Sequence, residues 1–526
     1  MAAWKESVGR MGDLGNRTAQ LTLVSISAAV IVVAAVVAGP VRDEGAELSP
    51  VSGSGTRTLP DGSVVPVGPG AEVESRGPTA RGGAPVVTEA GTTDDVAAAL
   101  PTAPPITATH IKVGIAYLKD PGAANAAAGF GSIGQVDQRR AWEAVIADIN
   151  RNPAFGRKVA PVWYATTTDD ITSRGAERIE QEACAHWTQD NKVFMVWDGI
   201  LGLDTLHSCL TKAKVPEVGT AGGLSWSQTY EKYPYVVHPA GMALDRLAKV
   251  EVDRLHAEGF FSEFKSNQPP YTPLKPADGK PRIGLIRYDT PAHKAAAVSM
   301  KKSLRPYGLA LCGGCEFEVS YSADNIPEQL DDATEVNAAI QSFKSRGVTH
   351  VMFLGSTAGV RITLFFVDGA EKQQYRPRLG FNPQDAPGAV RDFHGSASYP
   401  QFRQSILVTS GPNDLNLRTD AFKRCKKLFE DAGETFQGES ASNKLNQIDL
   451  YCDTAWYTRA ALDASGEALS LTSWLDGVAK VPTVDSAGTF VMRTTATRHD
   501  GAGGVRIGKW FDSCDCFKPT SDVIPV

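Results

Sequence analysis

Four of the eight cysteines have a spacing that predicts disulfide bonds between separate helices. Cys184 and Cys209 lie on predicted helices that flank one predicted strand, and Cys425 and Cys452 lie on two successive predicted helices. Disulfides are the default use of cysteine in exported proteins, and the N-terminal segment described below indicates export. We therefore expect the pairs Cys184–Cys209 and Cys425–Cys452.

The other four cysteines form two tight motifs, C-x-x-C at Cys312 and Cys315 and C-x-C at Cys514 and Cys516. Each motif can close on itself, or the two motifs can pair with each other. A four-thiolate zinc site and a redox-active C-x-x-C are weaker alternatives. The redox motif is disfavoured because no helix is predicted to begin at Cys312, where it would lower a thiol pKa. The sequence leaves these pairings open, and we predict no metal site.

The remaining motifs do not support catalysis. Residues 129–134 match G-x-G-x-x-G, but the preceding predicted strand ends near Tyr117, too early for a dinucleotide fingerprint. Residues 355–359 resemble a nucleophile elbow with Thr357, not serine, at the centre. The paired acids at 169–170 and 331–332 lie in polar stretches typical of solvated helix caps. We therefore predict that the protein is not an enzyme and uses no cofactor.

The length and the charge of the chain bound the number of globular units and the kind of partner. The chain has 526 residues, which favours about two to four globular units. Its 53 basic and 59 acidic residues give a formal charge of −6, which argues against nucleic acid as a partner.

The N-terminus carries one segment of membrane-spanning length. Residues 21–39 contain no charge, and Lys5, Arg10 and Arg17 precede them. A run of 19 residues nearly matches a hydrocarbon core of about 30 Å, and the positive flank keeps residues 1–20 cytoplasmic. We expect an uncleaved signal-anchor with the C-terminal domain extracellular. A cleaved signal peptide and a secreted protein remain the alternative.

After this segment the composition changes twice. Residues 40–108 are rich in Gly, Pro, Ser and Thr without a period of 2 or 3.6, which predicts a disordered linker. From residue 109 onward, short apolar strands alternate with amphipathic helices, and a second run of the same kind begins near 245. This alternation predicts an α/β fold with parallel sheets covered on both faces. Near the end, residues 489–512 predict a hairpin around 500–504.

The order of these pieces resembles the type I periplasmic solute-binding proteins, the Leu/Ile/Val-binding family of ABC transporters. The pieces are IKVGIAYL, KVFMVWDG, YPYVVHPAGMALDRLAKVEVDRL, RIGLIRYDTPAHKAAAVSMKKSL, VTHVMFLGSTAG and YRPRLGF, in the family's order. The resemblance implies two doubly wound parallel-sheet lobes joined by a three-strand hinge. It assigns 109–243 and 404–482 to lobe one, and 244–403 and 483–526 to lobe two.

In such a fold the loops after the strands face a crevice, and ligand-binding residues are expected there. The candidates in lobe one are Tyr117, Asp198, Gly199, Thr220, Ser225 and Trp226, and those in lobe two are Tyr288, Asp289, Ser356 and Thr357. The alternatives are core packing for Tyr117, loop packing for Thr220, Ser225 and Trp226, and helix capping for the others. The segment DGILGL at 198–203 lacks the Ser/Thr run of the family's amino-acid binders.

The resemblance therefore implies an extracytoplasmic protein that captures a small polar molecule, amino-acid-like or related, for an ABC importer. Its expected partners are this ligand, the ABC permease subunits and the membrane through 21–39. A membrane-anchored sensory domain of the same fold is the alternative.

Overall fold

The computed structural model describes only part of the chain. The described residues are 56–58, 64–66, 104–121, 135–199, 202–219, 225–262, 280–321, 326–355, 361–394, 399–437 and 444–526. Those from 104 onward belong to one compact unit, and β1 (Thr56–Thr58) pairs antiparallel with β2 (Val64–Pro66) in another. These two short strands fall inside the predicted disordered linker. The predicted membrane segment 21–39 lies outside the described residues, and no helix within them is long and apolar enough to cross a bilayer.

The first sheet is entirely parallel and has the strand order β4-β3-β5-β6-β7. Its strands are β3 (His110–Leu118), β4 (Lys158–Thr166), β5 (Met195–Asp198), β6 (Glu217–Gly219) and β7 (Val236–Val237). Strand β3 is buried along almost its whole length, as its continuous apolar sequence predicts for a parallel strand covered on both faces.

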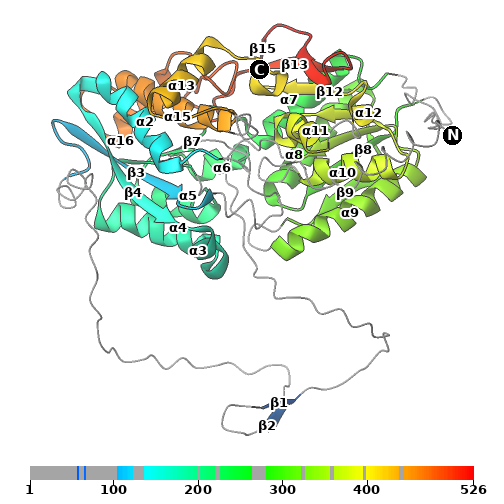
Figure 1. Ribbon diagram of the computed structural model, residues 1–526, viewed down its shortest axis with the longest axis horizontal. Coiled ribbons are helices and arrows are strands. Elements are labelled where there is room, and N and C mark those ends of the chain that lie inside the picture. Colours follow the sequence, from blue (N-terminus) through cyan, green and yellow to red (C-terminus); the bar gives the residue numbers. More distant parts are fainter. Residues whose placement is uncertain are drawn as a thin grey trace, which may run out of the picture. The chain divides into compact units, whose positions relative to one another are not determined.

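Helices cover both faces of the first sheet (Figure 1). One face carries α2 (Gln138–Arg151), α13 (Asp420–Asp431), α15 (Ile448–Ser465) and α16 (Leu471–Lys480). The other face carries α3 (Thr168–Arg174), α4 (Ala176–Ala185) and α5 (Asp204–Ala213). The helices α13, α15 and α16 therefore pack on the first sheet although strands β8 to β12 of the second sheet precede them in the chain.

The second sheet has eight strands, seven of them in the order β14-β13-β12-β11-β10-β8-β9, with β15 paired to β13. The strands are β8 (Ile283–Tyr288), β9 (Leu311–Val319), β10 (His350–Leu354), β11 (Arg378–Phe381), β12 (Ile406–Thr409), β13 (Gly504–Phe511), β14 (Cys516–Pro519) and β15 (Ile524–Pro525). Strands β8 to β12 are parallel, whereas β13 to β15 are antiparallel to their neighbours.

The second sheet is also covered on both faces. One face packs against α7 (Leu244–Ala257) and α8 (Pro291–Leu304). The opposite face packs against α9 (Ile326–Ser345), α10 (Arg361–Lys372), α11 (Pro387–His394) and α12 (Tyr399–Phe402).

Two details differ from the sequence analysis. The segment 404–482 was assigned to lobe one as a whole, but β12 lies in the second sheet. There Ile406 pairs with Gly380 of β11, and Thr409 pairs with Arg506 of β13. A four-residue apolar strand can complete either sheet, so only pairing decides its place. The hairpin predicted within 489–512 is present, but its turn is not at 500–504: antiparallel bridges join Met492 to Ala502 and Thr495 to Arg498, so the chain reverses between 495 and 498. A second hairpin turns at 512–515, between the paired residues Phe511 and Cys516.

Three segments connect the two sheets and their helices, namely 238–243, 410–419 and 481–503, and we call them the crossing segments. They are hydrogen-bonded to one another. His238 N donates to His499 O at 2.9 Å, and Gly501 N donates to His238 O at 2.8 Å. Phe490 N donates to Ser410 O at 2.9 Å. The three crossing segments therefore run side by side between the sheets.

All eight cysteines are paired. The disulfides are Cys184–Cys209, Cys312–Cys315, Cys425–Cys452 and Cys514–Cys516. The two predicted helix-to-helix pairs are confirmed, and the two tight motifs each close locally. Cross-pairing is prevented because β9 and β14 form opposite edges of the second sheet.

Candidate functional site

The strand order locates the expected binding edge of each sheet. In the first sheet, and among the parallel strands β8 to β12 of the second, the first strand lies between the second and the third, so the chain winds in opposite directions from that point. In such sheets the crevice lies outside the carboxyl ends of the first and third strands. Here these ends are Leu118 and Asp198 in the first sheet, and Tyr288 and Leu354 in the second.

A cavity of about 440 Å³ lies at the carboxyl end of β3. Its lining residues are Tyr117, Leu118, Lys119, Pro121, Gln135, Val136, Asp137, Gln138 and Arg139. The start of α2 is held against β3 because Gln138 Oε1 accepts a hydrogen bond from Leu118 N at 2.8 Å. Asp137 caps the helix by accepting from Arg140 N at 3.0 Å. These hydrogen bonds fix the start of α2 beside the carboxyl end of β3, where the cavity lies.

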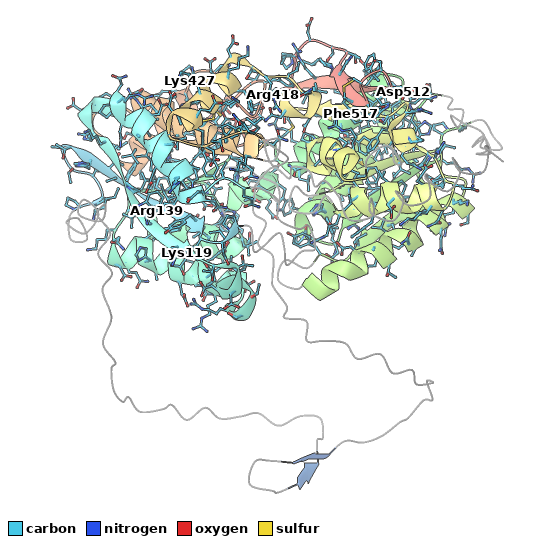
Figure 2. The ribbon with its side chains drawn as sticks, in the orientation of Figure 1. Lys119, Arg139, Arg418, Lys427, Asp512 and Phe517 are labelled. Atoms are coloured by element: carbon cyan, nitrogen blue, oxygen red, sulfur yellow. A yellow bond between two sulfur atoms is a disulfide. The ribbon has the colours of Figure 1, made fainter. Side chains whose placement is uncertain are left out.

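Arg139 gives this cavity a cation held by aromatic rings. Its guanidinium carbon lies 5.1 Å from the ring centre of Trp163 and 5.8 Å from that of Tyr117. Nη1 donates to the Tyr117 hydroxyl at 3.4 Å, and Nε donates to Glu143 at 3.0 Å. Lys119 adds a second positive charge at the same end of β3 (Figure 2). This combination suits an anionic ligand with an apolar body.

Of the two cavity residues Tyr117 and Arg139, the sequence analysis predicted only Tyr117. Tyr117 was predicted because it ends the first strand, and it does line the cavity, although only 9 % of it is exposed. Arg139 was missed. The available signal was the Arg139–Arg140 pair that follows the Gly-rich loop at the start of a predicted helix.

The predicted residues at the end of β5 face the protein interior. Asp198 is 5 % exposed, and a Cβ on Gly202 would lie 2.3 Å from its Oδ2, so this carboxylate lies against the loop that leads into α5. A Cβ on Gly199 would lie 3.1 Å from Trp142, which leaves little room on that side. The helix-cap alternative given for these two residues is wrong, because Leu203 is the N-cap of α5.

A buried carboxylate that the sequence analysis missed occupies the N-terminus of α5. Glu180 on α4 accepts hydrogen bonds from Gly202 N, Leu203 N and Leu206 N at 2.8, 2.7 and 2.9 Å. Burial raises the pKa of Glu180 to about 7, against these hydrogen bonds, which lower it. Because the protein's own carboxylate satisfies these N–H groups, they do not serve a ligand.

Ser225 and Trp226 connect the first sheet to the helices of the second. Ser225 O accepts from Leu244 N at 2.9 Å, and Trp226 packs against the cluster of α7 and α8 side chains. Thr220 lies outside the described residues. Loop packing, the alternative given for this segment, accounts for the two residues that are described.

Tyr288 at the end of β8 is fully buried in the second sheet's core. Its ring centre lies 5.1 Å from that of Tyr321 and 5.4 Å from that of His293, and burial raises its pKa. Asp289 is not the cap of α8, since Thr290 has that role, but it accepts from Tyr321 N at 2.9 Å. Sequence reasoning also missed Arg361, which is buried beside Tyr288 and pairs with Asp332 at 2.9 Å.

Directly after β10, buried side chains hold both the N–H and the carbonyl oxygen of Gly355. Gly355 N donates to Asp385 Oδ1 at 3.2 Å, and Gly355 O lies 3.0 Å from His293 Nε2. Asn382 and Glu251 continue this network, with 3.0 Å between Asn382 Nδ2 and Glu251 Oε2. Burial raises the pKa of both Glu251 and Asp385. The predicted residues Ser356 and Thr357 follow directly and lie outside the described residues.

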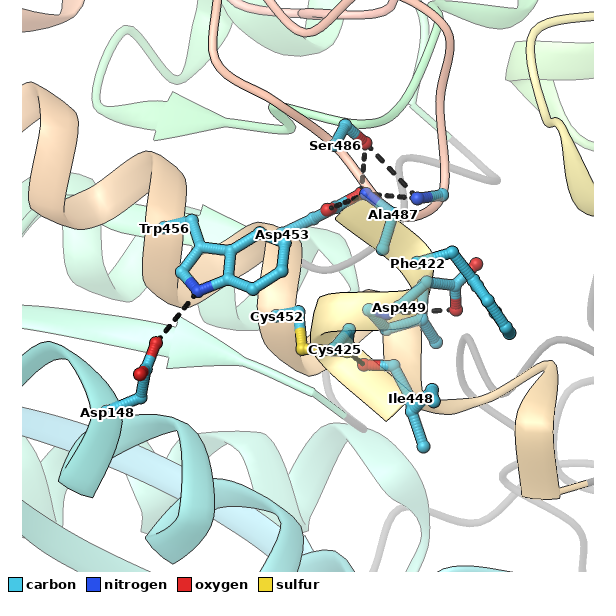
Figure 3. Close-up of a disulfide and its surroundings, with 12 residues drawn as sticks. Asp148, Phe422, Cys425, Ile448, Asp449, Cys452, Asp453, Trp456, Ser486 and Ala487 are labelled. Carbon is cyan, nitrogen blue, oxygen red and sulfur yellow. Dashed lines mark hydrogen bonds between the residues drawn. A yellow bond between two sulfur atoms is a disulfide. The ribbon is translucent and has the colours of Figure 1, made fainter. Parts of the chain in front are cut away.

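A further buried polar cluster braces the crossing segments (Figure 3). Asp453 on α15 accepts from Ala487 N at 2.7 Å and from Gly488 N at 3.0 Å. Burial and the neighbouring Asp453 raise the pKa of Asp449 to about 8. Within the described ranges, no group of three or more His, Cys, Asp or Glu side chains is arranged to hold a metal ion. The hydrogen bonds of Asp453 therefore attach the third crossing segment to α15.

The comparisons with known proteins agree with this architecture. No protein-family model matches the sequence, and no curated protein matches it either. In contrast, 459 chains of solved structures match the fold. One of them is a possible leucine/isoleucine/valine-binding protein from Rhodopirellula baltica SH 1, with 12% identity, a TM-score of 0.52, and coverage of 80% of this chain and 98% of its own.

Two other solved structures give the same result. An ABC transporter solute-binding protein from R. palustris in complex with 4-hydroxybenzoate has 14% identity and a TM-score of 0.52, with 79% and 96% of the two chains covered. A periplasmic binding protein type 1 from Bordetella pertussis Tohama I has 13% identity and a TM-score of 0.53, with 79% and 100% covered. This chain has the type I periplasmic-binding-protein fold. The recognition made from the sequence is thus confirmed at the level of the fold.

Within this type I periplasmic-binding-protein fold, the predicted residues do not form one cluster. Tyr117 lines the cavity of the first sheet, and Asp289 directly follows β8 in the second sheet. Asp198 and Tyr288 are buried, and Trp226 packs against the side chains of α7 and α8. Contact of any of them with a ligand stays a prediction.

Proposed function

We propose that this protein is an extracytoplasmic solute-binding protein that captures a small polar molecule and passes it to an ABC permease. The observation that carries the proposal is the pair of parallel sheets with the same winding, joined by three hydrogen-bonded crossing segments. Such a connection allows two binding edges to close on a ligand by bending a few residues. We propose the crossing segments as this hinge.

The cavity at β3 supports a small carboxylate with an apolar or aromatic body as the ligand. Arg139 supplies a charged donor, and Tyr117 and Trp163 supply aromatic faces. The 4-hydroxybenzoate of the R. palustris protein and the amino acids of the Leu/Ile/Val-binding proteins belong to this class. We propose that the ligand's carboxylate binds near Arg139 and that the loops after β8 and β10 contact its other end.

Export is supported by the cysteines. All eight are paired, and disulfides persist in oxidising compartments outside the cytoplasm. We propose that 21–39 anchors the protein in the cell membrane with 40–108 as a tether, or is removed so that the protein is secreted.

Thermal unfolding of the full chain with single amino acids and with benzoate derivatives, 4-hydroxybenzoate included, tests this function. A ligand at 100 times its dissociation constant adds about 2.7 kcal/mol to the free energy of unfolding. Small-angle scattering on the stabilised complex should then show a smaller radius of gyration than without ligand. A panel without any stabilising compound, or binding without compaction, would contradict the proposal.

Uptake separates the importer from the sensor. Right-side-out vesicles that carry this protein on their outer face together with its permease should accumulate the identified ligand only when ATP is loaded inside them. Binding without any ATP-dependent accumulation would favour the sensory alternative.

A further inference from the structure

The four disulfides fall into two structural groups. Cys184–Cys209 joins α4 to α5 across a sequence separation of 25. Cys425–Cys452 joins α13 to α15 across a separation of 27 (Figure 3). The two short disulfides each stay within one edge of the second sheet, with separations of 3 and 2. Because the loop-closure contribution of a disulfide grows with the length of the closed loop, the short ones contribute least to the stability of the fold.

The short disulfide at Cys514 and Cys516 is also the most accessible one. Residues 511–515 form a continuous exposed stretch that includes Cys514, and Cys516 is half-buried. Cys184, Cys315, Cys425 and Cys452 are completely buried, and Cys209 and Cys312 are half-buried, so only Cys514 is an exposed cysteine. Thiol–disulfide exchange requires a thiolate to reach one sulfur in line with the bond, so access selects the sulfur that is attacked. Cys514 is the more exposed residue of the pair, so we expect attack at its Sγ.

The hairpin that carries this disulfide is held by other contacts. The strands β13 and β14 pair from Gly508 with Pro519 to Phe511 with Cys516. Phe517 is 2 % exposed and packs against the rings of Phe402 and Trp510.

The turn itself also has contacts that do not involve sulfur. Asp512 accepts hydrogen bonds from Arg403 Nε at 3.1 Å and from Trp510 Nε1 at 2.9 Å. Opening the disulfide therefore leaves the hairpin paired and packed.

We propose that Cys514–Cys516 is a thiol–disulfide exchange site, reduced by an external dithiol while the fold and the other disulfides stay intact. This inference is independent of the proposed solute-binding function. A thiolate of the dithiol attacks Cys514 Sγ, forms a mixed disulfide and releases the Cys516 thiolate. The second thiol of the reductant then displaces the Cys514 thiolate. Two electrons and two protons pass to the cysteines, and the reductant leaves as its own disulfide.

Graded reduction of the full chain by dithiothreitol tests the site. Samples are quenched with N-ethylmaleimide at successive times, and peptide mapping measures the labelled fraction of each cysteine. We expect Cys514 and Cys516 to be labelled at least tenfold faster than the four helix-joining cysteines, with unchanged circular dichroism. Equal rates for all disulfides, or labelling of Cys514 only together with loss of the fold, would overturn the proposal.

Paired-serine variants separate an exchange site from a structural one. Cys514→Ser with Cys516→Ser should melt within a few degrees of the parent protein, and it should lose the fast labelling phase. The matched variant Cys425→Ser with Cys452→Ser should melt clearly lower and keep the fast phase. A fast phase that survives in the first variant would assign the site elsewhere and refute the proposal.

Discussion

Asp500 and Arg246 form an ion pair that ties the third crossing segment to α7, with 2.7 Å between Oδ2 and Nε. Their side chains are 5% and 20% exposed, and the same Oδ2 accepts from Ala243 N at 2.7 Å. Removing one partner of a buried pair leaves the other charge uncompensated. We expect Asp500→Asn to lower the free energy of unfolding by about 3 kcal/mol in urea denaturation.

Arg459 and Asp463 provide the matched control for this pair. They lie 2.8 Å apart on the surface of α15, with side chains 29% and 47% exposed. Solvent screens such a pair, so Asp463→Asn should cost less than about 1 kcal/mol. Equal losses in the two variants would show that burial of the crossing-segment pair does not matter.

The hydrogen bonds that hold Gly355, from its N–H to Asp385 and at its carbonyl oxygen with His293, form what we call the Gly355 clamp, and it predicts that this position accepts no side chain. A Cβ there would lie 2.8 Å from Asp385 Oδ1 and 3.2 Å from Gln384 O. Gly355→Ala should therefore lower the free energy of unfolding by about 1–3 kcal/mol and weaken binding of the ligand found in the thermal screen. Gly388 is the comparison, because nothing lies within 4 Å of its added Cβ. Gly388→Ala should leave both quantities nearly unchanged, and a neutral Gly355→Ala would refute the clamp.

Neighbouring arginines allow a sharp test of the cavity. Arg139 lies over Tyr117 and Trp163, whereas the side chain of Arg140 is 82% exposed and contacts Asp137 at 3.8 Å. If the ligand's carboxylate binds Arg139, Arg139→Gln should weaken binding by about tenfold to a hundredfold in calorimetric titration. Arg140→Gln should bind like the parent protein. An unchanged affinity in Arg139→Gln would exclude this cavity as the carboxylate site.

Asp449 predicts a specific dependence of stability on pH. Because burial raises its pKa to about 8, the folded protein holds a proton that the unfolded chain releases above about pH 4. The free energy of unfolding should therefore fall as pH rises toward 8, by at most about 1.4 kcal/mol per pH unit from this group.

Asp449→Asn removes that titration, so its free energy of unfolding should fall less between pH 6 and pH 8 than that of the parent protein. Urea denaturation at the two pH values measures the difference. The neighbouring Asp453 titrates at a lower pH, since burial raises its pKa only to about 6. Burial lowers the pKa of His207, but Glu217 raises it further, to about 9, and this group contributes equally to both proteins. Parallel decline in the two proteins would contradict the assignment.

Local patterns were enough to predict the repeating units of this fold. The runs IKVGIAYL and THVMFLG are continuously apolar because a parallel strand is buried on both faces, and β3 and β10 lie there. Cys184 and Cys209 were pairable because α4 and α5 flank β5 and pack on the same face of the first sheet. The end of β3 was likewise predictable as a binding edge, because the carboxyl ends of parallel strands meet there.

Tertiary structure alone decided which distant segments meet. The four apolar residues of β12 fit either sheet, and pairing with β11 and β13 placed them in the second. Glu180 reads as an ordinary helical glutamate until α4 packs beside the N-terminus of α5. Arg139 becomes a held cation only when β3 and β4 bring Tyr117 and Trp163 beneath it. Periodicity acts over a few residues, whereas these contacts depend on the folded positions of segments far apart in the chain.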